Sequence, residues 1–145
     1  NMAKELERNK SWQQALGYYL AVITVSNEAD GDTKDACCGI ARCAVELQDT
    51  GLLMDALRMV ESCISSDSGE EYEEYEYHKI LILDTLLQLG GINKLSSMSF
   101  HCSLMHSIAR LSMSSPSSPS PFIKDRERND NIGKIMARAN DLMKT

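Results

Sequence analysis

Imidazole and thiol side chains are the groups in this sequence best suited to chemistry, and their closest group is His101, Cys102 and His106. Cys102 and His106 stand four residues apart, so on a helix they would share one face and could reach the same metal ion. A structural zinc site needs four ligands, and two further ligands are missing nearby. We therefore predict no metal site at this position.

The other cysteines also indicate structure rather than catalysis. Cys37 and Cys38 are adjacent, and adjacent residues of a helix point about 100° apart, so they do not form a two-ligand zinc clip. Cys43 and Cys63 fall on positions typical of a core. Five cysteines in apolar, helix-like stretches are unlike the even, loop-spaced set of a small secreted domain. We expect buried thiols in a reducing, cytoplasmic compartment.

Two further motifs lack the features of an active site. Gly90-Gly91 is followed by Ile-Asn-Lys, not by the Gly-Lys-Ser or Gly-Lys-Thr of a phosphate-binding loop. The glutamates between Glu70 and Glu76 fit the first turns of a helix, where the macrodipole favours negative charge, whereas a catalytic carboxylate pair needs a concave apolar setting. A basic partner that docks on this acidic helix start is the alternative. We predict that the protein is not an enzyme and needs no cofactor.

Composition narrows the class further. The chain has 145 residues, of which 43% are hydrophobic and 25% charged, as in an ordinary globular domain. Lys and Arg number 15 against 21 Asp and Glu, and the resulting charge of −6 argues against nucleic-acid binding. No apolar run approaches the roughly 20 residues of a membrane span, and we expect no leader segment. We expect neither nucleic-acid binding nor membrane insertion.

Helical periodicity dominates the chain, and strand-like alternation is nearly absent. Polar and glycine-containing breaks separate seven expected helices, at about 2–9, 12–26, 33–47, 52–64, 70–89, 92–111 and 124–144. We expect Ser11 to cap the second helix and Gly51 to close the turn before the fourth.

A Ser/Pro-rich segment, 112–122, separates the last expected helix from the others. We interpret it as a flexible linker, because proline removes backbone donors and restricts the residue before it. Ser115, Ser118 and Ser120 each precede a proline, which makes them candidates for phosphorylation. In the last helix, Ile132 opens an apolar stripe that runs to Met143. We expect this helix to fold back as a cap, with docking on a partner as the alternative.

An internal repeat organises the first part of the chain. Trp12 is followed by apolar or small residues at steps of three, four and three, and Leu53 is followed by the same steps 41 residues later. A weaker copy starts at Asn93, after a further 40 residues. Leu6, Leu47 and Leu87 stand at equivalent places before each turn. Such a repeat predicts helix pairs that stack, because one pair cannot bury its apolar face alone.

The segments NKSWQQALGYYLAVI and GLLMDALRMVESC resemble the tetratricopeptide repeat family. The resemblance covers about 2–111, as two and three-quarter repeats, with a period of 40 to 41 where the family has 34. It implies an all-α fold, a right-handed α-solenoid of stacked antiparallel helix pairs. The domains would be 1–111 for the repeats, 112–122 for the linker and 123–145 for a capping helix. Another α-solenoid and a compact helical bundle are the alternatives.

The resemblance also implies a binding surface, because the first helix of each pair lines the concave groove in this family. The matching positions are Lys4, Glu7, Cys38, Ala41, Val45, Gln48, His78, Leu81, Thr85 and Gln88. These faces could instead be buried against neighbouring helices. The Lys/Asn clamp with which some members bind chaperone tails is not found at these positions.

We therefore expect a non-catalytic interaction module, a segment of a larger scaffold or complex subunit that binds a peptide or helix of a partner protein. The alternative is an accessory domain of a larger enzyme or membrane-trafficking protein that packs against its own parent chain. Self-association as a homodimer through the first helix pair is a further alternative.

Overall fold

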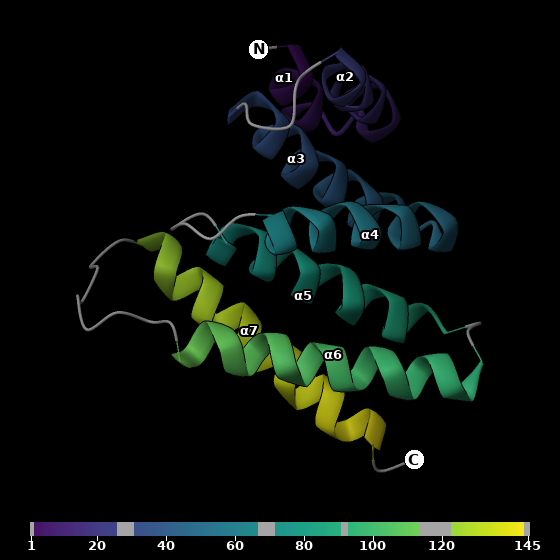
Figure 1. The fold of residues 1–145 in the computed structure, drawn as a ribbon, viewed down its shortest axis with the longest axis vertical. Helices are drawn as coiled ribbons and strands as arrows, with labels where there is room; N and C mark the ends of the chain where they lie inside the picture. The colour runs from purple at the N-terminus through teal and green to yellow at the C-terminus, as the bar shows by residue number, and fades with distance from the viewer. Residues whose placement is uncertain (1, 26–30, 67–71, 91–92, 114–122, 144–145) are drawn as a thin grey trace. The chain divides into compact units, whose positions relative to one another are not determined.

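A computed structural model describes residues 2–25, 31–66, 72–90, 93–113 and 123–143 (Figure 1). These residues form helices and no strand, which confirms the predicted all-α class. The predicted helices are confirmed as well, with ends that shift by one or two residues. They are α1 (Met2–Arg8), α2 (Trp12–Val25), α3 (Gly31–Leu47), α4 (Thr50–Ser66), α5 (Tyr72–Leu89), α6 (Lys94–Met113) and α7 (Ile123–Met143).

The chain divides into two compact units, Asn1–Gly90 and Gly91–Thr145. In the first unit each helix contacts the next one along the chain, and α3 also contacts α5. In Figure 1, α3, α4 and α5 follow one another down the view. The boundary between the units falls within the stretch that the sequence assigns to the repeats. The candidate phosphorylation sites Ser115, Ser118 and Ser120 lie outside the described residues.

The first helix of each pair ends on a residue in the left-handed conformation. After α1, Lys10 has φ 62°, and the Lys10 and Ser11 amides donate to the Glu7 and Leu6 carbonyls at 3.0 and 2.8 Å. This pair of bonds is a Schellman motif, which satisfies carbonyls at the end of a helix. Gln48 after α3 and Gly90 after α5 have φ 54° and 70°.

The expected role of Gly51 in closing the turn before α4 is wrong. Gln48 turns the chain, and Gly51 lies in the first turn of α4. Asp49 then starts α4, because its carboxylate accepts a hydrogen bond from the Leu52 amide at 3.2 Å. Asn93 starts α6 in the same way, accepting from the Ser96 amide at 2.7 Å. Such side-chain acceptors satisfy amides that have no partner inside the helix.

Burial follows the repeat in its first two copies. Ala15 and Ala56 are fully buried, and so, four residues on, are Tyr19 and Val60. In the third copy the starting residue Asn93 is exposed, consistent with its role as a helix cap. The first unit is therefore built from two junctions that use equivalent positions, one between α2 and α3 and one between α4 and α5.

The two junctions carry side chains of different sizes at equivalent positions. At the first, the ring of Tyr19 lies against Gly39, where a Cβ atom would come within 2.4 Å of the ring. The positions 41 residues on hold Val60 and Ile80, and both are fully buried. A large residue meets glycine at one junction, and two residues of intermediate size occupy the other. Interiors at crystal-like packing density require such compensation in volume.

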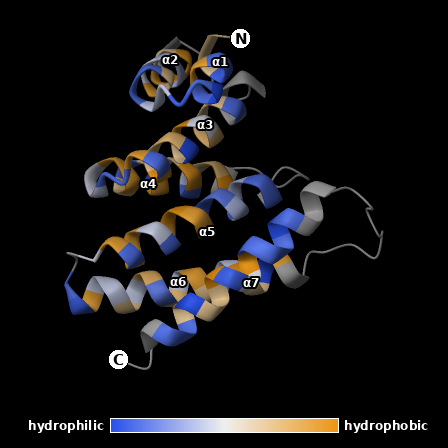
Figure 2. Ribbon diagram, turned by 180° about the vertical axis from the view of Figure 1, so that it is seen from behind, coloured by the Kyte–Doolittle hydropathy of each residue, from blue (hydrophilic) through white to orange (hydrophobic). Residues whose placement is uncertain are grey.

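The second unit contains α6 and α7, which contact each other. Leu104 and Ile108 of α6 are buried, as are Ile135 and Ala139 of α7. The His101 Nε2–H donates to the Ala139 carbonyl at 3.1 Å, which ties the helices together. The predicted stripe on α7 is therefore partly confirmed, although Met136 is 36% exposed. Figure 2 shows that the rest of α7 is mainly hydrophilic.

Replacing Lys10 by glycine should stabilise the protein by about 1 kcal/mol, because glycine adopts positive φ without the steric cost that an L side chain incurs. Lys4→Gly is the matched control within α1 and should destabilise by about 1 kcal/mol through helix propensity. Urea denaturation measures both. An equal decrease in the free energy of unfolding for the two variants would contradict the left-handed backbone conformation of Lys10.

Gly39→Ala should destabilise the protein by about 1–3 kcal/mol, because the new methyl group overlaps the Tyr19 ring. Gly17→Ala is the control, since nothing lies within 4 Å of a Cβ at that helical position, and it should stabilise by up to about 1 kcal/mol. Tyr19→Leu should lower the free energy of unfolding less in the Gly39→Ala variant than in wild type, as measured by urea denaturation. Additive effects would contradict the contact.

Candidate binding surface

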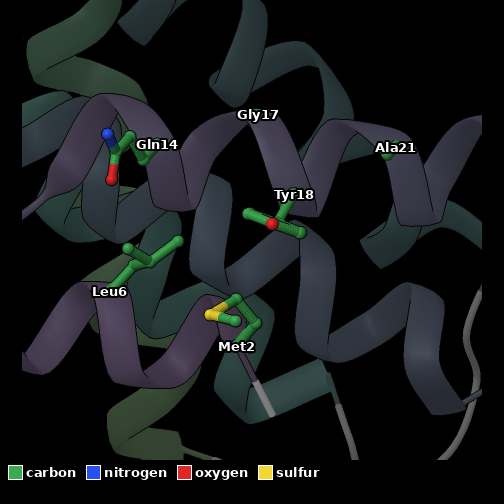
Figure 3. Close-up of a pocket in the computed structure, with 6 residues that line it drawn as sticks. All are labelled: Met2, Leu6, Gln14, Gly17, Tyr18 and Ala21. Atoms are coloured by element: carbon green, nitrogen blue, oxygen red, sulfur yellow. The ribbon is translucent and has the colours of Figure 1, made fainter.

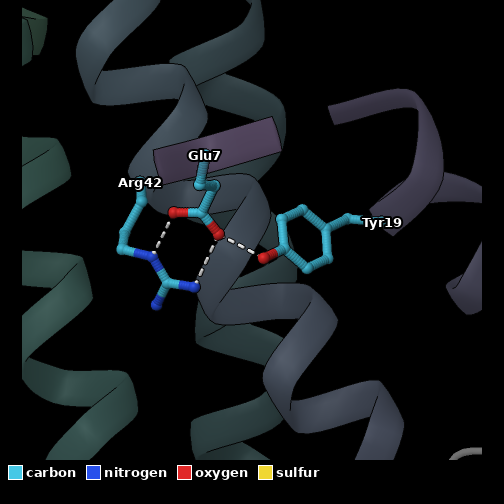
Figure 4. A network of polar contacts seen from close by, with 3 residues as sticks. All are labelled: Glu7, Tyr19 and Arg42. Atoms are coloured by element: carbon cyan, nitrogen blue, oxygen red, sulfur yellow. Dashed lines mark hydrogen bonds and ion pairs between the residues drawn. The ribbon is translucent and has the colours of Figure 1, made fainter. Parts of the chain in front are cut away.

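A charged cluster joins α1, α2 and α3 (Figure 4). Glu7 of α1 accepts two hydrogen bonds from the Arg42 guanidinium of α3, from Nε to Oε2 and from Nη2 to Oε1, each at 2.9 Å. The Tyr19 hydroxyl of α2 donates to the same Oε1 atom. A two-point fork of this kind fixes both partners in orientation as well as in distance.

The cluster is only partly open to water. The side chain of Arg42 is 39% exposed and that of Glu7 is 14% exposed, whereas Tyr19 is 3% exposed overall. Arg42 therefore has one edge bound to Glu7 and part of its side chain accessible from solvent. Ion pairs at this depth contribute more than fully exposed pairs, because water screens them less.

The surroundings of the cluster shift the pKa values of its members in opposite directions. Burial alone would raise the pKa of Glu7, but the hydrogen bonds from Arg42 and Tyr19, with the charges of Arg42 and His78, bring it below 4.5. Burial and the hydrogen bond to Glu7 raise the pKa of Tyr19 to about 12. The Glu7 hydrogen bond also raises the pKa of Arg42. The charged pair and the neutral phenol are thus the favoured states over a wide pH range.

Helix α5, which contacts α3, carries the last four residues of the predicted surface. His78 is 6% exposed, and its Nδ1–H donates to the Glu74 carbonyl at 2.8 Å. Further along α5, the Thr85 hydroxyl donates to the Leu81 carbonyl at 2.8 Å, and the Gln88 side-chain amide donates to the Asp84 carboxylate at 2.9 Å. Leu81 and Thr85 are partly exposed, so they present one apolar and one small polar side chain to solvent.

The structure places the ten residues of the predicted surface on α1, α3 and α5 or directly after α3, as follows. Cys38, Ala41 and His78 are buried, Glu7, Val45, Leu81 and Thr85 are partly exposed, and Lys4, Gln48 and Gln88 are exposed. Helices α3 and α5 contact each other, so the predicted surface residues of these two helices lie on neighbouring elements. The Glu7–Arg42 pair joins α1, which carries Lys4 and Glu7, to α3. A partner can reach the exposed and partly exposed members directly.

Sequence reasoning missed Arg42 and Tyr19 as members of this cluster. Arg42 is the lone charged residue in the stretch 36–45, which is otherwise apolar or glycine. A charge in such a run requires a partner, because burying it alone costs several kcal/mol. That signal could have identified Arg42. Nothing in the local sequence specified that the partner would be Glu7, 35 residues earlier.

Of the thiols considered for chemistry, Cys37 and Cys63 lie in contact, with their sulfur atoms 3.4 Å apart. Cys43 is fully buried, and burial raises the pKa of its thiol to about 11. Cys102 and His106 are exposed on α6. Within the described part of the chain, no three His, Cys, Asp or Glu side chains are placed to hold a metal ion. Nor is any described helix long and apolar enough to cross a membrane.

A shallow apolar groove lies between α1 and α2 (Figure 3). Met2 and Leu6 form one side, and Tyr18 and Ala21 are among the residues on the other. Met2 is 55% exposed and Tyr18 is 50% exposed. Helix α2 carries no charged residue in its 14 positions, so this part of the surface is uncharged as well as apolar.

Comparison with known proteins identifies no relative of the chain. No protein-family model matches it, and no curated protein or solved structure is significantly similar to it. Any assignment of family or function therefore rests on the residues and geometry described above.

Glu7→Gln should lower the free energy of unfolding by about 1.5–3 kcal/mol at pH 7, because it removes a carboxylate that accepts three hydrogen bonds. The pKa of Glu7 is lowered in the folded state, so its stabilisation is complete above about 4.5 and declines as the pH falls through the folded value. The difference between wild type and variant should therefore shrink in acid. Urea denaturation between pH 7 and 3 measures it.

The control for this experiment is Asp55→Asn. Asp55 pairs with Arg58 at 2.6 Å, but both side chains are more than 60% exposed, at 67% and 74%. Exposed pairs contribute little, so Asp55→Asn should match wild type at each pH. A Glu7→Gln difference that is the same at pH 7 and pH 3 would contradict the ionised cluster.

Proposed function

We propose that this chain is a non-catalytic protein–protein interaction module, a TPR-like, right-handed solenoid segment of a larger cytoplasmic scaffold or complex subunit. It holds a peptide or helix of a partner protein on a surface made by α1, α3 and α5. The supporting observation is that the first helices of successive pairs are joined to one another, α1 to α3 by the Glu7–Arg42 pair and α3 to α5 by direct packing. Stacked pairs in repeat proteins present such continuous surfaces.

The chemistry of the accessible residues indicates the kind of segment that fits. Val45 of α3 and Leu81 of α5 are partly exposed apolar side chains, and Thr85, Gln48 and Gln88 add neutral polar groups. Partly exposed apolar groups with a polar border are typical of the anchors and rim of a protein interface. We therefore expect a partner helix or strand that places apolar side chains over Val45 and Leu81.

Photo-crosslinking tests this proposal at single positions. A photoreactive phenylalanine analogue in place of Leu81 should crosslink to a partner protein in cells that express the gene, whereas the same analogue at Arg58 should not. Arg58 is the control because it lies on α4, is 74% exposed and belongs to no part of the proposed surface. Val45→Glu should abolish the Leu81 crosslink without changing the helical circular dichroism. Crosslinks from Arg58 alone would overturn the proposal.

The groove between α1 and α2 favours a second candidate, in which the chain packs against its own parent chain or self-associates. The outward positions Gly17 and Leu20 of α2 correspond, 41 residues on, to Arg58 and Glu61 of α4. The same face is thus charged on α4 and uncharged on α2. Sedimentation equilibrium of wild type and Tyr18→Glu distinguishes self-association, which should be lost in the variant. A monomeric wild type would exclude it.

A further inference from the structure

Two thiols of the first unit lie in contact across a helix pair. The sulfur atoms of Cys37 on α3 and Cys63 on α4 are 3.4 Å apart. A disulfide needs the sulfurs about 2.0 Å apart, so forming the bond brings the two atoms about 1.4 Å closer together. None of the five cysteines forms a disulfide in the structure. We propose that Cys37 and Cys63 form a reversible oxidation site, in which a peroxide converts the two thiols into a disulfide between α3 and α4.

The two thiols differ in access, which assigns them different steps. Cys63 is partly exposed, whereas Cys37 is 4% exposed. A dissolved oxidant therefore reaches Cys63 first, and Cys37 lies behind it in position to attack. The hydrogen bond with Cys63, together with burial, raises the pKa of Cys37. Because the thiolate is the reactive form, closure of the disulfide should speed up as the pH rises.

The reaction balances with hydrogen peroxide as the oxidant. The Cys63 thiolate attacks one peroxide oxygen, forming an S–O bond, breaking the O–O bond and releasing hydroxide, which leaves a sulfenic acid. The Cys37 sulfur then attacks the Cys63 sulfur, forming the S–S bond and expelling the sulfenic oxygen as water. Each sulfur gives up one electron, and the peroxide is reduced to two waters. A dithiol reductant reverses the change by thiol–disulfide exchange.

The position of the pair determines what the bond would do. The α3–α4 turn lies at Gln48 and Asp49, whereas Cys37 is in the first half of α3 and Cys63 is three residues before the end of α4. The disulfide would therefore clamp the open end of this helical hairpin. It closes a loop spanning 26 positions, which restricts the unfolded chain.

Tryptic mapping of the whole chain after treatment with hydrogen peroxide tests the proposal. Cleavage after Lys34, Arg42, Arg58 and Lys79 puts Cys37 and Cys38 on peptide 35–42 and Cys63 on peptide 59–79, while Cys43 and Cys102 lie on other peptides. We expect 35–42 to be linked to 59–79, with loss of two hydrogens, a higher Tm and reversal by dithiothreitol.

Three variants separate the cysteines involved. Cys38→Ser is the matched control and should still form the link and raise Tm on oxidation, whereas Cys37→Ser and Cys63→Ser should do neither. Circular dichroism before oxidation verifies that each variant is folded. The proposal would be overturned by a link that persists in Cys37→Ser, or by a wild type in which Cys102 is oxidised while Cys37 and Cys63 remain thiols.

Discussion

The fold of the first unit depends on the close approach of α2 to α3 at Tyr19. The ring occupies the space in which Gly39 would carry a Cβ atom, and the hydroxyl at its far end donates to Glu7 of α1. One side chain therefore sets the spacing of two helices and the position of a third. Helix α1 has only seven residues, and a helix that short is not stable without tertiary contacts. Its place in the fold follows from this constraint and from the Arg42 fork.

The second junction reaches the same geometry with different chemistry. Glu7, Tyr19 and Arg42 correspond, 41 residues on, to Gln48, Val60 and Leu83. Val60 and Leu83 are fully buried, so apolar side chains stand at the positions that Tyr19 and Arg42 occupy in the first junction. Apolar packing is insensitive to pH, whereas the cluster at the first junction loses its carboxylate in acid. The stability of α1 should thus respond to the protonation of Glu7.

The sequence was sufficient to predict the helices and the equivalence of the first two repeat copies, because helical period and small residues at close contacts are local signals. Ala15 and Ala56 are an example, since both stand three residues after the start of a repeat copy and both are fully buried. The turn before α4 was not predictable in the same way. Gly51 was the obvious candidate, but the left-handed residue is Gln48, whose side chain gives no sign of positive φ.

The candidate surface shows the same limit. Helical spacing identifies the face to which Cys38 and Ala41 belong, but it does not indicate which neighbouring helix covers that face, and both residues are buried. It also does not reveal contacts between distant segments, such as that of Glu7 with Arg42.

Amide hydrogen exchange in wild type, Arg42→Met and Arg58→Met tests most directly whether the charged cluster holds α1 in place. Arg58→Met is the matched control because it removes the same side chain from an exposed pair. We predict that Arg42→Met increases exchange of the α1 amides about tenfold or more, corresponding to a loss of about 1.4 kcal/mol or more, while α4 and α5 remain protected. Arg58→Met should exchange like wild type. Unchanged protection of α1 in Arg42→Met would contradict the account.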